Sequence, residues 1–160
     1  MENIIMGLDP ASFKNMGFCI AKDSKDLMKI LKSGTIVFDV DKETKDERFI
    51  ELEKKLEGLI KEYKIQTIAF ERTQFGKAFV MSQIYETIGV IKLIAYKNCL
   101  TIKEISPMTA KKAITGNGRA KKKEIMQSVI DIFKINKKNL SSEHEADAIA
   151  ICFAHTKIEK

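Results

Sequence analysis

Two short apolar runs that each end in a carboxylate constrain the fold of this chain more than any other feature. Residues 3–9 (Asn-Ile-Ile-Met-Gly-Leu-Asp) and 66–71 (Gln-Thr-Ile-Ala-Phe-Glu) have the pattern of strands that are buried on both faces. Residues 44–63 between them begin with a capping box and continue with apolar residues at helical spacing. Because a helix that crosses over between two such strands makes them parallel, Asp9 and Glu71 are expected to meet at the carboxyl edge of the sheet, where ligands bind.

Further β-type runs predict a mixed sheet. Residues 17–21 and 27–37 are separated by a turn-prone segment, so they should extend the first strand into an antiparallel meander. Residues 100–105 add another strand, which ends at Ser106-Pro107. No linker, repeat or low-complexity segment divides the chain, and we therefore expect one α/β domain over residues 1–160.

A long helix before residue 100 has more than one apolar face. One face carries, at helical spacing, Val80, Ile84, Ile88, Ile91 and Ala95. Met81, Tyr85 and Leu93 add apolar surface on other sides. A helix of this kind usually covers a sheet and also meets a partner, which predicts a homodimer interface here; the alternative is a helix that is only deeply buried.

The composition limits the class of protein. With 44% hydrophobic and 31% charged residues in 160 positions, the chain is an ordinary globular protein with room for a sizeable core. No apolar run approaches the ~18 residues of a membrane span, and the start lacks the basic region of a signal peptide. Cys19, Cys99 and Cys152 are each flanked by apolar residues, which indicates buried cytosolic thiols. Any metal would be held by carboxylates, as suits Mg²⁺ or Mn²⁺.

The net charge of +6 is concentrated in one segment. Residues 110–138 contain nine basic and two acidic residues, a net charge of +7, so the remainder is close to neutral. Such a stretch indicates a polyanionic partner, nucleic acid first, and the alternative is a solvated lysine-rich face. Within it Gly116 and Gly118 lie beside lysines ahead of a helix, which predicts a phosphate cradle of backbone N–H groups and ammonium charge.

The segment 142–150 supplies two further metal-capable side chains. Ser142 and Glu145 have capping-box spacing, which places a helix start there and assigns Glu145 to capping or surface charge. His144 and Asp147 are then three residues apart on one helix face. The alternative is that these acids only cap the helix.

Together these residues predict a reaction. Three carboxylates that converge with a histidine need a compensating cation. Two divalent ions about 4 Å apart would supply it and would assist the cleavage of a phosphodiester. The residues therefore predict metal-dependent hydrolysis of nucleic acid.

The same residues resemble the RuvC family of Holliday junction resolvases. The resemblance rests on G-x-D-P from Gly7 to Pro10, on Glu71, on P-x-x-x-K-x-x-x-T-G-x-G-x-A-x-K over residues 107–122 and on H-x-x-D-A-x-A over residues 144–150. It implies an RNase H-like fold, a mixed five-stranded sheet with helices on both faces. It also implies a homodimer that cuts a four-way DNA junction with paired, near-symmetrical nicks, using two Mg²⁺ or Mn²⁺ ions per site.

The resemblance also carries site roles to individual residues. Asp9, Glu71 and Asp147 fall on the family's catalytic and metal-binding carboxylates, and His144 falls on its fourth site. Lys111 falls on a basic residue that serves catalysis, and Phe75 and Phe79 are candidates for an aromatic that enters the junction. DNA-binding roles are expected of the basic loop, at Lys112, Gly116, Gly118, Arg119, Lys121 and Lys122.

Alternatives remain at this stage. An RNase H-like nuclease for forks, flaps or RNA–DNA hybrids is the first, and a junction-binding module without catalysis is the second. The compact, lysine-rich chain also resembles resolvases of bacteriophages, so the expected place of action is the cytoplasm of a bacterial cell or of a phage-infected bacterium. The need for a RuvA/RuvB branch-migration motor is left open.

Overall fold

The computed structural model describes residues 3–10, 14–23, 28–72 and 78–158. Its elements in chain order are β1 (Asn3–Asp9), β2 (Asn15–Asp23), β3 (Met28–Val37), α1 (Lys45–Tyr63), β4 (Thr67–Glu71), α2 (Ala78–Lys97), β5 (Thr101–Ile105), α3 (Pro107–Thr115), α4 (Lys122–Phe133), the short 3₁₀ helix η1 (Lys137–Asn139) and α5 (Glu143–Ile158). The strands form one sheet in the order β3-β2-β1-β4-β5, in which β1 is antiparallel to β2 and parallel to β4. The predicted meander and the parallel pairing of the two carboxylate-ended strands are confirmed.

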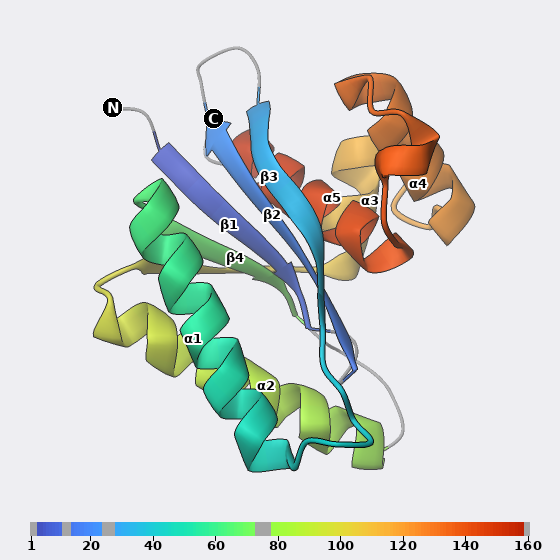
Figure 1. Cartoon of the computed structure of the whole chain (residues 1–160). Coiled ribbons are helices and arrows are strands. Elements are labelled where there is room, and N and C mark those ends of the chain that lie inside the picture. Colours follow the sequence, from blue (N-terminus) through green and yellow to red (C-terminus); the bar gives the residue numbers. More distant parts are fainter. Residues whose placement is uncertain (1–2, 11–13, 24–27, 73–77, 159–160) are drawn as a thin grey trace.

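Helices cover both faces of the sheet, as predicted. Figure 1 shows α1 and α2 against one face and α3, α4 and α5 against the other. Each face has its own apolar core, one with side chains of α1 and α2 and the other with side chains of α3, α4 and α5. The central strands are buried on both faces for this reason, which explains their nearly continuous apolar sequences.

Strand alternation decides on which face the acidic residues lie. Ile5 of β1 packs into the core under α5, whereas Met6 packs into the core under α1 and α2. Because side chains two residues apart share a face, Asp9 projects on the α5 side. Ala69 belongs to the same core, so Glu71 projects on that side as well.

Two glycines let α5 approach the sheet closely. A Cβ at Gly7 would lie 2.6 Å from the carbonyl oxygen of Ala148, and a Cβ at Gly17 would lie 1.8 Å from the carbonyl oxygen of His144. Gly17 is the antiparallel partner of Asp9 in the β1–β2 ladder. The absence of a side chain at Gly17 therefore brings the start of α5 directly over the end of β1.

Helix α2 departs from the sequence prediction at its start. Val80 was expected on the inward face but is 45% exposed, because the buried face of α2 begins one turn later, at Ile84. The outward positions Tyr85 and Leu93 are exposed, as expected of a helix that is not only buried. By length and composition α2 could also cross a membrane; core helices share these properties, and 39% of its most apolar window is buried in the fold.

The cysteines were predicted to be buried, and one is not. Cys19 and Cys152 lie in the core under α5, and burial keeps the pKa of the Cys19 thiol well above its ordinary value. Cys99 is exposed, because it occupies the turn between α2 and β5 with a left-handed φ of 54°. Of its two neighbours only Leu100 is apolar, and Asn98 is a residue typical of turns, a signal that the prediction did not use.

Substitution of Gly17 tests the close approach of α5. Gly17→Ala should lower the free energy of unfolding by about 1–3 kcal/mol, the usual cost of overpacking, because the new methyl group meets a backbone carbonyl that cannot move alone. The measurement is chemical denaturation. Gly58→Ala is the control, since nothing lies within 4 Å of its Cβ; a helical alanine there should stabilise by about 0.5–1 kcal/mol. Equal stability of Gly17→Ala and the natural protein would contradict the packing described here.

Candidate active site

Four metal-capable side chains line one pocket at the carboxyl edge of the sheet. Asp9 ends β1 and Glu71 ends its parallel neighbour β4, while His144 and Asp147 project from the first turns of α5. The pocket has a volume of about 170 Å³, several times the ~30 Å³ that one water occupies in the liquid. The four candidates, which are separated by up to 138 positions in the sequence, are thus brought together by the fold.

Asp9 and His144 are in direct contact. The His144 Nδ1 atom lies 2.8 Å from Asp9 Oδ2, and Asp9 is only 2% exposed. Because a carboxylate only accepts hydrogen bonds, Nδ1–H is the donor, and in the neutral imidazole this tautomer leaves Nε2 with a lone pair. The same hydrogen bond raises the pKa of His144 above its ordinary value, against the opposing effect of burial.

The other two carboxylates are held in an unfavourable environment. Burial, followed by the charges of Asp9 and Asp147, raises the pKa of Glu71 to about 7. Burial and the charge of Asp9 likewise raise the pKa of Asp147 to about 6. Without a cation the cluster therefore resists full ionisation at neutral pH, which is the electrostatic signature expected of a site that binds positive charge.

Two lysines complete the wall of the pocket. Lys111 comes from α3 and Lys122 from the first turn of α4, and the positive charge of each lowers the pKa of both Glu71 and Asp147. The Lys122 Nζ atom is 2.9 Å from Glu143 Oε2, and this hydrogen bond raises the pKa of Lys122. Two ammonium groups beside a carboxylate cluster suit a substrate that carries negative charge.

The donor set fits a hard divalent cation. Three carboxylates and one imidazole nitrogen face the pocket with no thiolate among them, which suits Mg²⁺ or Mn²⁺ better than a soft metal. Within the described ranges no three His, Cys, Asp or Glu side chains are already placed to hold an ion.

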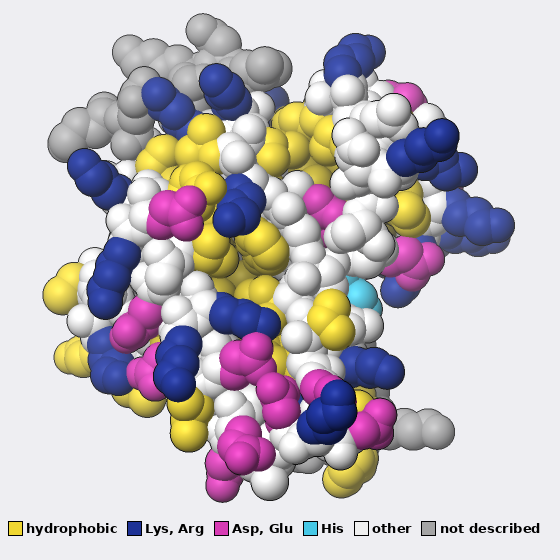
Figure 2. Space-filling view, in the orientation of Figure 1, with side chains coloured by type: hydrophobic (Ala, Val, Ile, Leu, Met, Phe, Trp, Pro, Cys, Tyr) yellow, Lys and Arg dark blue, Asp and Glu magenta, His cyan; other side chains and the backbone are white. Residues whose placement is uncertain are grey.

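The basic loop lies next to this pocket but mostly outside it. Lys112, Arg119 and Lys121 are exposed and do not line the carboxylate pocket. Figure 2 shows Lys and Arg side chains gathered over α4, at the right of the view. The two glycines differ from each other: Gly116 ends α3 with a φ of 80° and has open space around it, whereas a Cβ at Gly118 would meet the Met108 side chain at 2.6 Å. Met108 is itself 64% exposed, so the close approach at Gly118 is to a surface side chain, and the phosphate cradle at the two glycines stays a prediction.

Of the two aromatic candidates, Phe79 lies within the described residues and Phe75 does not. Phe79 is 74% exposed in the first turn of α2. This exposure leaves the Phe79 ring accessible to a ligand.

Glu145 was interpreted incorrectly from the sequence. The Ser142 hydroxyl accepts from the Glu145 backbone N–H at 3.1 Å, so half of the predicted capping box exists. The Glu145 side chain is 3% exposed and binds Ser33 and Ser141 instead of returning to Ser142. Its spacing of four from the buried Ile149 was the signal that placed it on an inward helix face.

Comparison with known proteins identifies relatives along nearly the whole chain. Residues 5–155 match the family model described as crossover junction endodeoxyribonuclease RuvC. The crossover junction endodeoxyribonuclease RuvC of Prochlorococcus marinus is 32% identical over 98% of this chain and 96% of its own length. That of Petrotoga mobilis is 29% identical over 95% of this chain and 92% of its own length. The Thermus thermophilus RuvC structure superposes with a TM-score of 0.82 at 20% identity, covering 95% of this chain and 92% of the other, which shows a shared RNase H-like fold.

The raised carboxylate pKa values predict how stability depends on pH. Folding raises the pKa of Glu71 from 4.5 to about 7, so the folded state binds more protons than the unfolded state in this range. Stability of the metal-free protein is therefore lost as pH rises from about 4.5 to about 7 through this group. Glu71→Gln removes the buried charge and should stabilise the metal-free protein by about 1–3 kcal/mol at pH 8.

The measurement is chemical denaturation of both proteins in chelator at pH 5 and pH 8. The stability difference between Glu71→Gln and the natural protein should shrink towards pH 5, where Glu71 is protonated. Added Mg²⁺ should favour the natural protein at pH 8, because the cation offsets the repulsion. A difference that is constant with pH would contradict the raised pKa of Glu71.

Proposed function

Because this chain belongs to the RuvC family of crossover junction endodeoxyribonucleases, we propose that it resolves four-way DNA junctions by paired hydrolytic nicks, acting as a homodimer. The observation that carries the proposal is the pocket in which three carboxylates and His144 face two lysines at the edge of the sheet. The family's nucleases depend on divalent metal ions. Residues 1–160 make up a single nuclease domain in this proposal, and the sheet that both cores share supports it.

The metal ligands are Asp9, Glu71, Asp147 and the Nε2 atom of His144, and the metal is Mg²⁺ or Mn²⁺ with two ions per site. When bound, the two cations activate a water and stabilise the leaving oxygen of the phosphodiester. The rise of the Glu71 and Asp147 pKa values in the metal-free pocket supports this assignment, because bound cations would return both groups to their ionised form.

His144 is oriented by Asp9 for one of two tasks. With Nδ1–H donated to Asp9, the Nε2 lone pair is directed away from that contact and can bind an ion or accept a proton from the attacking water. The 2.8 Å hydrogen bond at Nδ1 orients the imidazole ring, so Nε2 is not needed for that purpose. Both tasks require the neutral imidazole and hence this tautomer.

The lysines bind the scissile phosphate and its neighbours. Lys111, half-buried in the pocket wall, contributes positive charge at the reacting phosphate. Lys122 and Lys121 line one surface hollow at the start of α4. Together with the exposed Lys112 and Arg119 and the open backbone at Gly116, they contact the DNA backbone in this proposal. Gly118 stays a candidate for contact with DNA through its backbone. Phe79 and Phe75 stay candidates for stacking on exposed bases.

Dimerisation has a physical reason in the substrate. A four-way junction is approximately two-fold symmetric, and an isologous dimer places two identical sites on strands of like polarity. We assign the contact to α2, where Tyr85, Leu93 and Tyr96 are 55%, 56% and 82% exposed. Exposed apolar and aromatic side chains along one helix are typical of protein–protein interfaces.

The place of action is the cytoplasm of a bacterial cell, because the named relatives are bacterial enzymes that act on DNA. Action in a phage-infected bacterium is a further prediction from the compact, lysine-rich sequence.

A structure-selectivity assay tests the function. With Mg²⁺ or Mn²⁺, the protein should cut a four-way junction at two symmetrical positions and leave linear duplex intact, while forks, flaps and RNA–DNA hybrids measure the alternative of broader specificity. Mapping of the cut sites also tests dimeric action. Asp9→Asn is the control: it keeps the oxygen that accepts from His144 but removes a metal-binding charge, so cutting should fall at least 10²-fold with junction binding retained. Equal cutting of junction and linear duplex would refute junction resolution.

The lysine loop is tested by the salt dependence of junction binding. Lys122→Ala should weaken binding and reduce the slope of log affinity against log salt by about 1, because one fewer counterion is released. The matched control is Lys55→Ala on α1, on the opposite face of the sheet, where Lys55 also pairs with an acid, Glu51. The assignment of Lys122 to DNA would be wrong if both variants kept the slope of the natural protein.

A further inference from the structure

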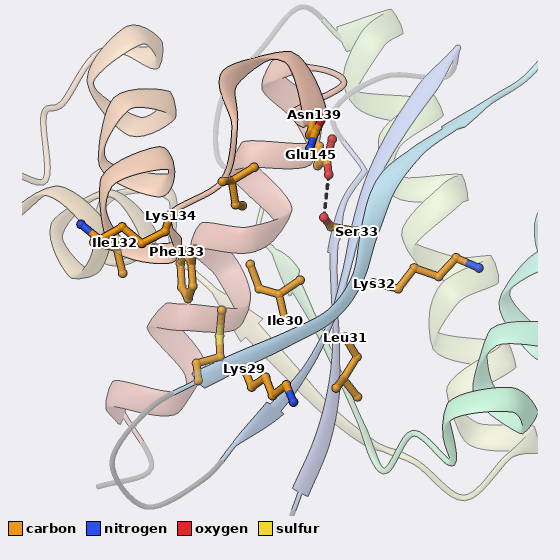
Figure 3. A pocket seen from close by; sticks show the side chains of 12 residues that line it. Lys29, Ile30, Leu31, Lys32, Ser33, Ile132, Phe133, Lys134, Asn139 and Glu145 are labelled. Carbon is orange, nitrogen blue, oxygen red and sulfur yellow. Dashed lines mark hydrogen bonds between the residues drawn. The ribbon is translucent and has the colours of Figure 1, made fainter.

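A buried carboxylate joins the edge strand β3 to the first turn of α5, outside the carboxylate pocket. Ser33 Oγ donates to Glu145 Oε1 at 2.6 Å. The backbone N–H and the hydroxyl of Ser141 donate to Glu145 Oε2 at 2.6 and 2.5 Å. Figure 3 shows the contact between Ser33 and Glu145 at the wall of a pocket that lies between β3 and α4.

A second contact from the same strand reinforces the first. Thr35 Oγ1 lies 2.6 Å from Ser142 Oγ and 3.1 Å from Ser141 Oγ, and Ser142 Oγ accepts from the backbone N–H of Glu145. Ser33 and Thr35 are two residues apart on β3, so they face the same side of the sheet. We refer to the five residues that make these bonds as the polar clasp: Ser33, Thr35, Ser141, Ser142 and Glu145.

The clasp holds its geometry firmly. A buried carboxylate is costly unless it is hydrogen-bonded, and Glu145, at 3% exposure, has three donors within 2.6 Å. Hydrogen bonds to a charged acceptor are short and about twice as strong as neutral ones. Loss of one donor would leave the carboxylate underbonded, so the arrangement has little freedom to shift.

The clasp acts on the part of α5 that carries the site. Glu145 is adjacent to His144 and two residues before Asp147. From Ala146 onward the helix is anchored by the apolar core, through Ile149 and Cys152 among others. The residues before Ala146 instead depend on polar bonds on the β3 side and on the close approach to Gly17 on the β2 side. Both constraints act beside the His144 side chain: Gly17 approaches the His144 carbonyl, and the hydrogen bonds hold the next residue, Glu145.

We propose that Glu145 is a positioning residue, which through Ser33 and Ser141 fixes the first turn of α5 and thereby holds His144 on Asp9 and Asp147 in the carboxylate pocket. This inference rests on the proposed function of that pocket. It explains why an acid is buried one residue from a candidate ligand without facing the pocket itself. Misplacement of reacting groups by about 1 Å can cost about 10²-fold in rate, so the clasp controls the rate of cutting more than the binding of DNA.

Four variants distinguish the effect of the hydrogen bonds of Glu145 from the effect of its negative charge. Glu145→Ala removes all three side-chain bonds and Ser33→Ala removes one. Glu145→Gln keeps an oxygen for Ser141 and offers an amide to Ser33, so it preserves the shape without the charge. Ser128→Ala on α4 is the matched control for the serine substitution, because no hydrogen bond of its hydroxyl is part of the clasp.

Two readouts are compared. In the metal-free protein, the imidazole proton resonances of His144 are followed by NMR at one pH; the chain has two histidines, so the assignment is simple. In the metal-loaded protein, the single-turnover rate on a saturating four-way junction is measured beside the junction affinity. Glu145→Ala should shift the His144 resonances and slow cutting by about 10- to 100-fold, with Ser33→Ala intermediate and junction affinity unchanged. Glu145→Gln and Ser128→Ala should match the natural protein.

Each contrary result has a definite meaning. Natural His144 resonances and a natural cutting rate in Glu145→Ala would overturn the proposal, and so would a Gln variant as impaired as the Ala variant, since the charge would then matter more than the geometry. If Glu145→Ala does not fold, Ser33→Ala decides, because it removes one bond from a helix that the core still anchors. If the natural protein cuts no junction, the proposed function fails, while the NMR comparison still tests the clasp.

Discussion

The contact between His144 and Asp9 depends on how closely α5 can lie on the sheet. Glycine stands at both positions where the α5 backbone crosses β1 and β2, and a methyl group at Gly17 would overlap the His144 carbonyl. The helix therefore lies close enough to the sheet for His144 to contact Asp9 at the end of the central strand β1. Every other part of the site follows from this approach: the pocket closes over Glu71, Asp147 enters from the same helix face, and α3 and α4 add their lysines at the rim.

The site is assembled against an electrostatic cost. Burial and mutual repulsion raise the pKa values of Glu71 and Asp147. Ionisation of these two carboxylates therefore lowers the stability of the metal-free fold. Lys111 and Lys122 lessen the repulsion and do not remove it. A fold can tolerate this electrostatic cost when a bound cation removes it. The carboxylate cluster therefore indicates cation binding, and with it an enzyme rather than a DNA-binding module without catalysis. The surrounding apolar cores supply the stability that the site gives up.

Two kinds of contact hold α5 on the sheet, and they differ in how precisely they fix its position. Apolar packing of Ile149 and Cys152 fixes that α5 lies on the sheet but tolerates small shifts. The hydrogen bonds of Glu145 to Ser33 and Ser141 have short distances and fixed directions. A direction-dependent contact next to His144 is the kind of constraint that a metal site requires, since its ligands must be held to within a fraction of an ångström.

The sequence by itself determined the elements and the edge of the sheet where the chemistry lies. Apolar runs ending in Asp9 and Glu71, with a capped helix between them, are local patterns that depend on burial and helical period alone, and the resemblance over residues 107–122 and 144–150 added the family. Only the tertiary structure decided that Glu145 is buried and that Val80 and Cys99 are exposed, because burial of a single side chain depends on which distant element covers it. Glu145 has the local sequence pattern of a helix cap. Its side chain instead points inward and binds Ser33, because β3, more than a hundred residues earlier in the chain, places Ser33 opposite it.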